Sequence, residues 1–223
     1  MTANPRNNLS RRIRRLAFAL ALPAVALAAF VLSVVAHHNF HIVSPGLVYR
    51  SGQMNAGALS EIIPEYGIKS ILNLRGPGAD KDWYVAEVDA ARRLGVQHFD
   101  YALSASRELT DEEMDEILAT IRAAPKPILI HCKSGSDRTG LAGALYLYSL
   151  EGRPAPLAGR QLTVLYGHIP HFLWSETVAM DNSFWRYVKN HTQPSADALV
   201  GTAGQEDAST LASPHASHNP ATH

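Results

Sequence analysis

The sequence predicts an α/β domain with a mainly parallel central sheet flanked by helices, preceded by one membrane-spanning helix. Between residues 47 and 190, short apolar runs alternate with stretches of helical period. Near the N-terminus, residues 16–36 form a run without a charged residue, polar only at Ser33, that is long enough for a helix across ~30 Å of hydrocarbon. The chain has 223 residues, of which 46% are hydrophobic, so one domain with a sizeable core is expected.

Local signals place each element of this domain. Asn55 is a good N-cap and Gly67 a good stop signal for a helix between them. Thr110 and Glu113 have the spacing of a capping box, which predicts a helix from residue 110. Apolar runs predict strands at residues 47–49, 68–74, 96–101 and 127–131. Helical signals predict further helices at residues 83–94, 140–150, 155–166 and 180–189.

The N-terminal 36 residues carry the signals for membrane insertion. Residues 1–15 contain five arginines and no acidic residue. A basic flank stays in the cytoplasm, so residues 16–36 are expected to anchor the protein with its domain outside, in the periplasm of a Gram-negative cell. The small residues of Val34-Val35-Ala36 leave one alternative, a cleaved signal peptide and secretion to the periplasm.

Composition divides the rest of the chain into three parts. Residues 37–46 resemble a juxtamembrane spacer, and residues 47–190 hold the alternating pattern of the domain. Residues 191–223 are rich in Ala, Ser, Thr, His and Pro with little apolar periodicity, which predicts a disordered tail.

Charge and cysteine content exclude several classes of function. Twenty basic and 20 acidic residues balance, whereas obligate nucleic-acid binding favours a basic surplus, so no nucleic-acid partner is expected. Cys132 is the single cysteine, which excludes an internal disulfide and any cysteine-clustered metal site. Histidines at 37, 38 and 41, and at 168 and 171, have metal-ligand spacing, but the first group lies at the membrane exit and a histidine in a loop needs no ligand. We expect neither a metal nor a cofactor.

A chemical role for Cys132 follows from its neighbours, His131-Cys132-Lys133-Ser134-Gly135-Ser136-Asp137-Arg138-Thr139-Gly140. The segment lies between an apolar strand and a helix, where successive backbone N–H groups and the helix dipole bind anions. The same groups favour a cysteine thiolate. Arg138 is placed to hold two oxygens of a phosphoryl group. The expected substrate-binding residues are His131, Lys133, Ser134, Gly135, Ser136 and Thr139, with Thr139 offering its hydroxyl to the sulfur and His131 orienting the loop.

This segment matches H-C-x5-R-[ST], the signature of cysteine-dependent phosphatases. Together with Val48–Gln53 and the run IKSILNL before Arg75, it resembles the atypical dual-specificity phosphatases, above all bacterial membrane or periplasmic members. The resemblance covers about residues 47–170. It implies a compact α/β phosphatase fold, a phosphocysteine intermediate and no metal, with Cys132 as the nucleophile and Arg138 as the phosphate clamp.

The identity of the general acid does not follow from the resemblance as directly as that of the nucleophile. The family usually places an aspartic acid about thirty residues before the cysteine. Asp100 has that spacing but falls within a predicted strand, and the loop after it offers only Glu108. Asp137 precedes Arg138, as in phosphoinositide phosphatases of the myotubularin and Sac types, where an aspartic acid at this place is a proposed acid. We favour Asp137, with Asp100, Glu108 or no dedicated acid as alternatives.

The sequence therefore predicts a membrane-anchored phosphatase that hydrolyses phosphomonoesters through a phosphocysteine. Its expected substrate is a phosphorylated protein, with a lipid or inositol phosphate as the alternative. Asp137 and Lys133 together tilt the choice slightly toward a non-protein substrate, because Lys133 adds positive field for substrates with several phosphates. A sulfur-transfer or arsenate-reducing enzyme, and a catalytically weak phosphate-binding module, are the other interpretations. Arsenate reduction generally needs resolving thiols, and this chain has no second cysteine.

Overall fold

The computed structural model describes residues 37–170 and 176–191, together with six positions of a helical stretch between residues 18 and 28. Within these residues, no helix has both the length and the apolar character needed to span a membrane. Most of residues 16–36, and all of residues 192–223, lie outside the described part. The expected anchor and disordered tail therefore stay predictions.

A five-stranded sheet forms the centre of the domain, in the order β1-β2-β5-β3-β4. The strands are β1 (His41–Ser44), β2 (Val48–Ser51), β3 (Ser70–Asn73), β4 (Gln97–Asp100) and β5 (Ile128–His131). β1 pairs antiparallel with β2, and the other three pairings are parallel. The predicted α/β class with a mainly parallel sheet is confirmed.

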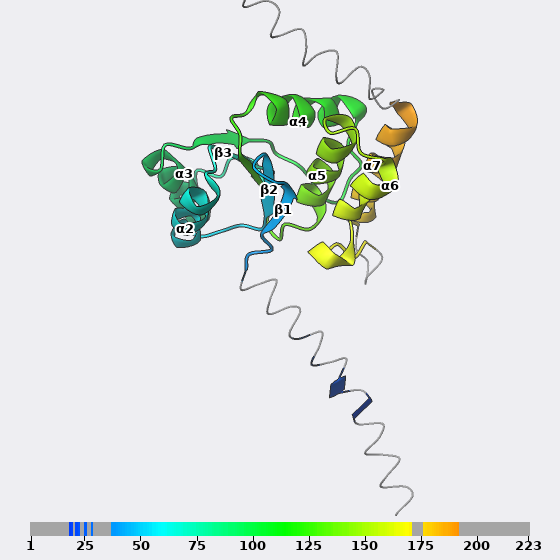
Figure 1. The fold of residues 1–223 in the computed structure, drawn as a ribbon, viewed down its shortest axis with the longest axis horizontal. Helices are drawn as coiled ribbons and strands as arrows, with labels where there is room; N and C mark the ends of the chain where they lie inside the picture. Colours follow the sequence, from blue (N-terminus) through cyan, green and yellow to red (C-terminus); the bar gives the residue numbers. More distant parts are fainter. Residues whose placement is uncertain are drawn as a thin grey trace, which may run out of the picture.

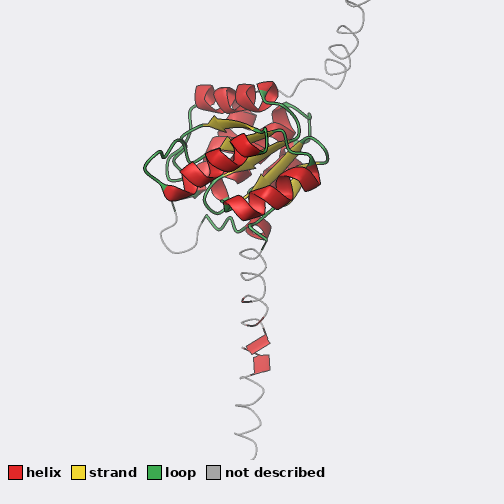
Figure 2. Cartoon of the chain, turned by 90° about the vertical axis from the view of Figure 1, so that its left-hand side faces the viewer, coloured by secondary structure: helices red, strands yellow, loops and turns green. Residues whose placement is uncertain are grey.

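Alternate side chains of the strands pack into two different hydrophobic cores. Leu72, Ile128 and Ile130 belong to a large core with α4 (Asp111–Ala123), α5 (Asp137–Ser149) and α7 (Val178–Asn190). Ile71 and Leu129 point to a smaller core with α2 (Ala56–Tyr66) and α3 (Asp82–Arg93). Figures 1 and 2 show the strands between these two groups of helices. The alternation follows from the period of two along a strand.

The spacer predicted at residues 37–46 is wrong, because this segment belongs to the domain. β1 lies within it and pairs with β2 through a tight turn at Pro45-Gly46, where Gly46 has φ +72°. A four-residue strand is too short to show a period in the sequence, and pairing with β2 supplies its structure. Asn39, which precedes β1, is 2% exposed and contacts the loop at Cys132.

The predicted caps are confirmed, and one predicted helix is not. Asn55 caps α2, Gly67 ends it in the left-handed conformation, and Thr110 forms the capping box with Glu113. The helix expected at 155–166 is broken into α6 (Ala155–Ala158) and two 3₁₀ turns, η1 (Gly159–Gln161) and η2 (Val164–Tyr166). The Gln161 carbonyl accepts a hydrogen bond from Arg50 at 2.9 Å, which withdraws it from any continuing helix.

Candidate active site

Cys132 follows the central strand β5, which pairs with β2 on one side and β3 on the other. Both faces of β5 are covered, and all four of its residues are buried. Cys132 itself is 1% exposed and begins the loop that leads into α5. The parallel topology thus places the cysteine at the carboxyl end of the sheet, directly before a helix N-terminus.

Successive carbonyl groups of this loop are bound from outside. Their donors come from β2, from the turn after it and from the segment before β1. Gln53 N donates to Lys133 O at 3.1 Å, Asn39 Nδ2 to Ser134 O at 2.9 Å, and Arg50 Nη2 to Gly135 O at 2.6 Å. Within a peptide unit the N–H points opposite to the carbonyl, so the bound carbonyl of Ser134 leaves the N–H of Gly135 facing inward. The Gly135 N–H accordingly donates to Cys132 Sγ at 3.3 Å.

Gly135 is required at the tip of this loop. It has φ +76°, in the left-handed region that glycine adopts without strain. A Cβ here would come 2.6 Å from the backbone nitrogen of Gly52 and from the carbonyl carbon of Ser51. The loop therefore packs directly on the backbone that follows β2.

Arg50 holds the loop from a buried position. It is 1% exposed, its Nη1 also donates to Gln161 Oε1 at 2.6 Å, and its Cζ lies 4.0 Å above the centre of the Tyr166 ring. Burial lowers its pKa to about 10, although the charges of Tyr166, Cys132 and Asp137 oppose that shift, so it stays cationic at neutral pH. In the sequence, Arg50 belongs to a segment that carries the family resemblance; the signal for its role is an arginine inside a short apolar strand.

Arg138 is held on one side and free on the other. Its Nη1 donates to the carbonyl oxygens of Leu74 and Leu103 at 3.3 and 3.2 Å. Its Nε is buried and has no hydrogen-bond partner among the described residues. A buried guanidinium nitrogen without an acceptor is costly, and a bound oxyanion would satisfy it.

The hydroxyl of Thr139 does not contact the sulfur as expected from the sequence. Thr139 is fully buried, and its Oγ1 has no hydrogen-bond partner in the described part of the chain. Ser136 is also buried, whereas Lys133 and Ser134 are exposed at the outer side of the loop. The predicted substrate-binding residues thus split into buried and exposed sets.

His131 is turned toward a buried carboxylate, Glu87, that no sequence motif indicates. Its Nε2 lies 2.9 Å from Glu87 Oε1, and His98 Nε2 lies 2.8 Å from the same oxygen. Glu87 is 1% exposed. Burial would raise its pKa, but the hydrogen bonds from His131, His98 and Gln53 lower it to about 2. His131 therefore anchors the end of β5 to α3, in keeping with an orienting role.

A second arginine lies beside the loop. The Arg75 guanidinium stacks on the Trp83 ring at 3.5 Å and donates to Gln53 Oε1 at 3.1 Å. Burial and the charge of Arg138 lower its pKa, while the charges of Glu87 and Cys132 oppose the shift. Arg75 thus adds positive potential next to Arg138 and Cys132, a role that the resemblance alone did not assign to it.

The three acid candidates have different partners. Asp100, at the end of β4, accepts from Asn73 Nδ2 at 2.8 Å and from the Tyr84 hydroxyl. Glu108 accepts from Asn182 Nδ2 at 2.9 Å and from Arg186 Nη1 at 2.7 Å, both on α7. Asp137 is the first residue of α5, and its Oδ1 lies 2.7 Å from His168 Nδ1. Of these carboxylates, only Asp137 belongs to the loop and helix that follow Cys132.

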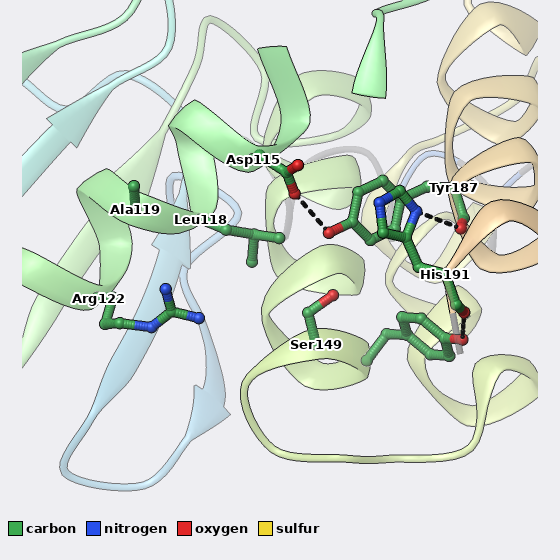
Figure 3. A pocket seen from close by; sticks show the side chains of 8 residues that line it. Asp115, Leu118, Ala119, Arg122, Ser149, Tyr187 and His191 are labelled. Atoms are coloured by element: carbon green, nitrogen blue, oxygen red, sulfur yellow. Dashed lines mark hydrogen bonds between the residues drawn. The ribbon is translucent and has the colours of Figure 1, made fainter. Parts of the chain in front are cut away.

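Figure 3 shows a pocket of about 420 Å³ that lies apart from this loop. It is lined by residues of α4, the end of α5 and α7, including Asp115, Arg122 and Ser149. The Tyr187 hydroxyl donates to Asp115 Oδ1 at 2.7 Å, and the Tyr187 ring stacks on His191 with centroids 3.8 Å apart. None of its lining residues belongs to the Cys132 loop. The residues 171–175, which include His171, lie outside the described part, and the described residues contain no cluster of potential metal ligands.

Known structures share this fold. TpbA from P. aeruginosa matches with a TM-score of 0.52 and 22% identity, over 74% of this chain and 91% of TpbA. The catalytic core of the PP-IP phosphatase Siw14 from S. cerevisiae matches with a TM-score of 0.53 and 18% identity, over 76% of this chain and 93% of that chain. PTPMT1 matches with a TM-score of 0.50 and 11% identity, over 68% and 97%. At such low identity these likenesses show the fold.

The family itself comes from the sequence. No curated protein sequence matches the chain significantly. The sequence profile of the tyrosine phosphatase family matches residues 33–155, which include all five strands and the Cys132 loop. The chain belongs to the tyrosine phosphatase family and is a cysteine-dependent phosphatase-like hydrolase.

Proposed function

We propose that this protein is a membrane-anchored phosphatase that hydrolyses phosphomonoesters through a phosphocysteine at Cys132. One observation carries the proposal: the loop carbonyls of Lys133, Ser134 and Gly135 are bound from outside, and the Gly135 N–H donates to Cys132 Sγ at 3.3 Å. This arrangement is a preformed oxyanion site around a nucleophile. The arginine beside it has a buried Nε without an acceptor among the described residues.

In the first step the Cys132 thiolate attacks phosphorus in line with the leaving oxygen. The Gly135 N–H and the N-terminus of α5 stabilise the thiolate before attack. Arg138 and the inward N–H groups hold the equatorial oxygens as charge develops on them. Because Leu74 and Leu103 fix one nitrogen of Arg138, its guanidinium is preorganised for this contact.

Asp137 is the proposed acid for the leaving oxygen and the base for the water that hydrolyses the phosphocysteine. It is the carboxylate nearest in sequence to Arg138, at the first turn of α5. Asp137→Asn should therefore slow alkyl phosphates strongly and a nitrophenyl phosphate much less, because nitrophenolate leaves without protonation. Asp100→Asn serves as the comparison, and a leaving-group dependence in that variant instead would assign the acid to Asp100.

The substrate proposed first is a phosphorylated protein. The TpbA structure with phosphotyrosine, in a cysteine-to-serine variant, supports an aryl phosphate in this fold. The PP-IP phosphatase Siw14 supports the alternative, an inositol phosphate, and a lipid phosphate belongs to the same chemical class. The exposed Lys133 and the stacked Arg75 favour additional negative charge on the substrate.

The anchoring rests on residues 16–36 and their arginine flank. We propose that the domain lies outside the cytoplasm, with secretion after signal cleavage as the alternative.

Phosphate release from a substrate panel tests the proposed function. The full-length protein in detergent is compared on a phosphotyrosine peptide, a phosphoinositide, phosphatidylglycerol phosphate and 4-nitrophenyl phosphate. Cys132-dependent release without added metal supports the proposal. Release that survives in Cys132→Ser, or that depends on added metal, contradicts it.

A further inference from the structure

His168 joins the start of α5 to α7. It follows η2 and is 2% exposed. Its Nδ1 lies 2.7 Å from Asp137 Oδ1, and its Nε2 lies 2.7 Å from Asp181 Oδ2 in the first turn of α7. Two ring nitrogens that both face carboxylates must both donate, so this histidine is an imidazolium.

The surroundings of His168 favour its protonated form at neutral pH but still allow the ring to release a proton. Burial alone would lower the pKa of His168, but the hydrogen bonds and charges of Asp137 and Asp181 raise it to about 9. The buried Arg50 is a further charge that acts on Asp137, from β2. Among the described residues, Asp137 on α5 and Asp181 on α7 are the charged groups in hydrogen-bond contact with the ring.

Within the phosphatase function proposed above, we infer that His168 is the proton source of the reaction and delivers its Nδ1 proton through Asp137 to the leaving oxygen. In that step the S–P bond forms and the P–O bond breaks. The N–H bond of His168 is lost, the O–H bond of the released alcohol is gained, and His168 becomes neutral. In the second step water attacks phosphorus, its proton returns through Asp137 to His168, and the thiolate leaves.

A carboxylate by itself does not explain how a proton is available at neutral pH. Asp137 Oδ1 faces the protonated Nδ1 of His168 and accepts its hydrogen bond, so the proton between them belongs to the histidine. Asp100 faces the Tyr84 hydroxyl, whose pKa the hydrogen bond to Asp100 raises to about 12, and Glu108 faces Arg186. The Tyr84 hydroxyl therefore keeps its proton through the neutral range, whereas His168 has a proton that it can release.

Asp181 determines which proton moves. Its Oδ2 holds the Nε2 proton, so the neutral histidine keeps that proton and releases the one on Nδ1 toward Asp137. It also fixes the ring plane from α7, outside the loop itself. Asp181 is therefore a positioning residue that acts through His168.

The test is a set of pH–rate profiles of the full-length protein in detergent, with an alkyl phosphate and with 4-nitrophenyl phosphate. For the alkyl phosphate, the wild-type alkaline limb is expected near pH 9. His168→Gln should lose on the order of 10²-fold or more at neutral pH with this substrate, and much less with 4-nitrophenyl phosphate. Asp181→Asn should move the alkaline limb to lower pH, because one of the two carboxylates that raise the pKa of His168 is gone.

His191→Gln is the matched control, since His191 follows the C-terminal end of α7 and lines the pocket of Figure 3. It should keep the wild-type profile. An unmoved alkaline limb in Asp181→Asn, or an equal loss on both substrates in His168→Gln with tungstate affinity retained, overturns the inference. Failure of the proposed function itself would give a different result. In that case, turnover of 4-nitrophenyl phosphate would not require Cys132.

Discussion

Arg50 Nη2 donates to the carbonyl oxygen of Gly135 at 2.6 Å, from the strand that pairs with β5 on one side. A side chain of β2 thereby determines how the loop after β5 curls. The same guanidinium reaches Ser136 O at 3.3 Å and both oxygens of Gln161. Arg50 thus links the sheet, the Cys132 loop and the segment that leads to His168.

Arg50→Met should cost both stability and activity. The carbonyls of Gly135 and Gln161 would be left buried without donors, and each orphaned group costs about 1–3 kcal/mol. The loop would then no longer hold its N–H groups toward a bound oxyanion. The affinity for tungstate, an oxyanion that probes the phosphate site, should therefore fall together with kcat. Denaturant unfolding and tungstate titration measure the two effects. Arg50→Lys keeps the charge but not the fork, and should recover stability better than activity.

Gly135→Ala and Gly46→Ala form a matched pair. Both glycines have a left-handed φ, +76° and +72°, so both variants have a similar backbone strain of about 1 kcal/mol. A Cβ at Gly135 would also meet the backbone of Gly52 and Ser51 at 2.6 Å, whereas nothing lies within 4 Å at Gly46. Gly135→Ala should therefore abolish tungstate binding and turnover, and Gly46→Ala should retain both. Equal activity of the two variants would contradict the geometry of the loop.

Glu87 should make stability depend on pH in the acid range. Its folded pKa is about 2, below the ordinary value of 4.5, so its contribution is fully present above pH 4.5 and is lost as the pH falls toward 2. Glu87→Gln should reduce the free energy of unfolding by on the order of 1–3 kcal/mol at neutral pH. Denaturant unfolding at pH 7 and pH 3 is the measurement. The difference in the free energy of unfolding between wild type and Glu87→Gln should be smaller at pH 3 than at pH 7. An equal difference at both pH values would exclude this linkage.

The proposed membrane topology rests on the sequence of residues 1–36. A reporter fused after His191 should be active outside the cytoplasm, and the intact protein should stay in the membrane fraction after an alkaline wash. N-terminal sequencing gives the competing outcome. A soluble product that starts near His37 would show a cleaved signal, and a reporter active only in the cytoplasm would contradict export altogether.

Most of the fold was predictable because local signals are strong where capping and periodicity coincide. Asn55, Gly67 and the Thr110–Glu113 box each determine an end of a helix through contacts within a few residues. β1 and the break at Gly159–Gln161 were not predictable in this way. Both depend on partners distant in the sequence, β2 in one case and Arg50 in the other.

The candidate site was likewise predictable only in part from the sequence. The Cys132 loop is a local motif, so its place between strand and helix followed from the sequence alone. Three further residues, Glu87, Asn39 and His168, contact this segment only in the folded chain. Each is separated in sequence from its partner, by 44, 95 and 31 positions respectively. A single histidine or glutamate in a sequence gives no sign of such a contact, and the spacing of His168 and His171 suggested a metal ligand instead.

Turnover and tungstate binding by Cys132→Ser test the central claim most directly. The hydroxyl of serine is not ionised near neutral pH, so turnover of 4-nitrophenyl phosphate should fall by on the order of 10⁴-fold or more. Tungstate should still bind, because Arg138 and the Gly135 N–H remain in place. Arg138→Lys is the complementary variant and should lose both, since a point charge does not replace the guanidinium fork. Turnover by Cys132→Ser at the wild-type rate would contradict the account.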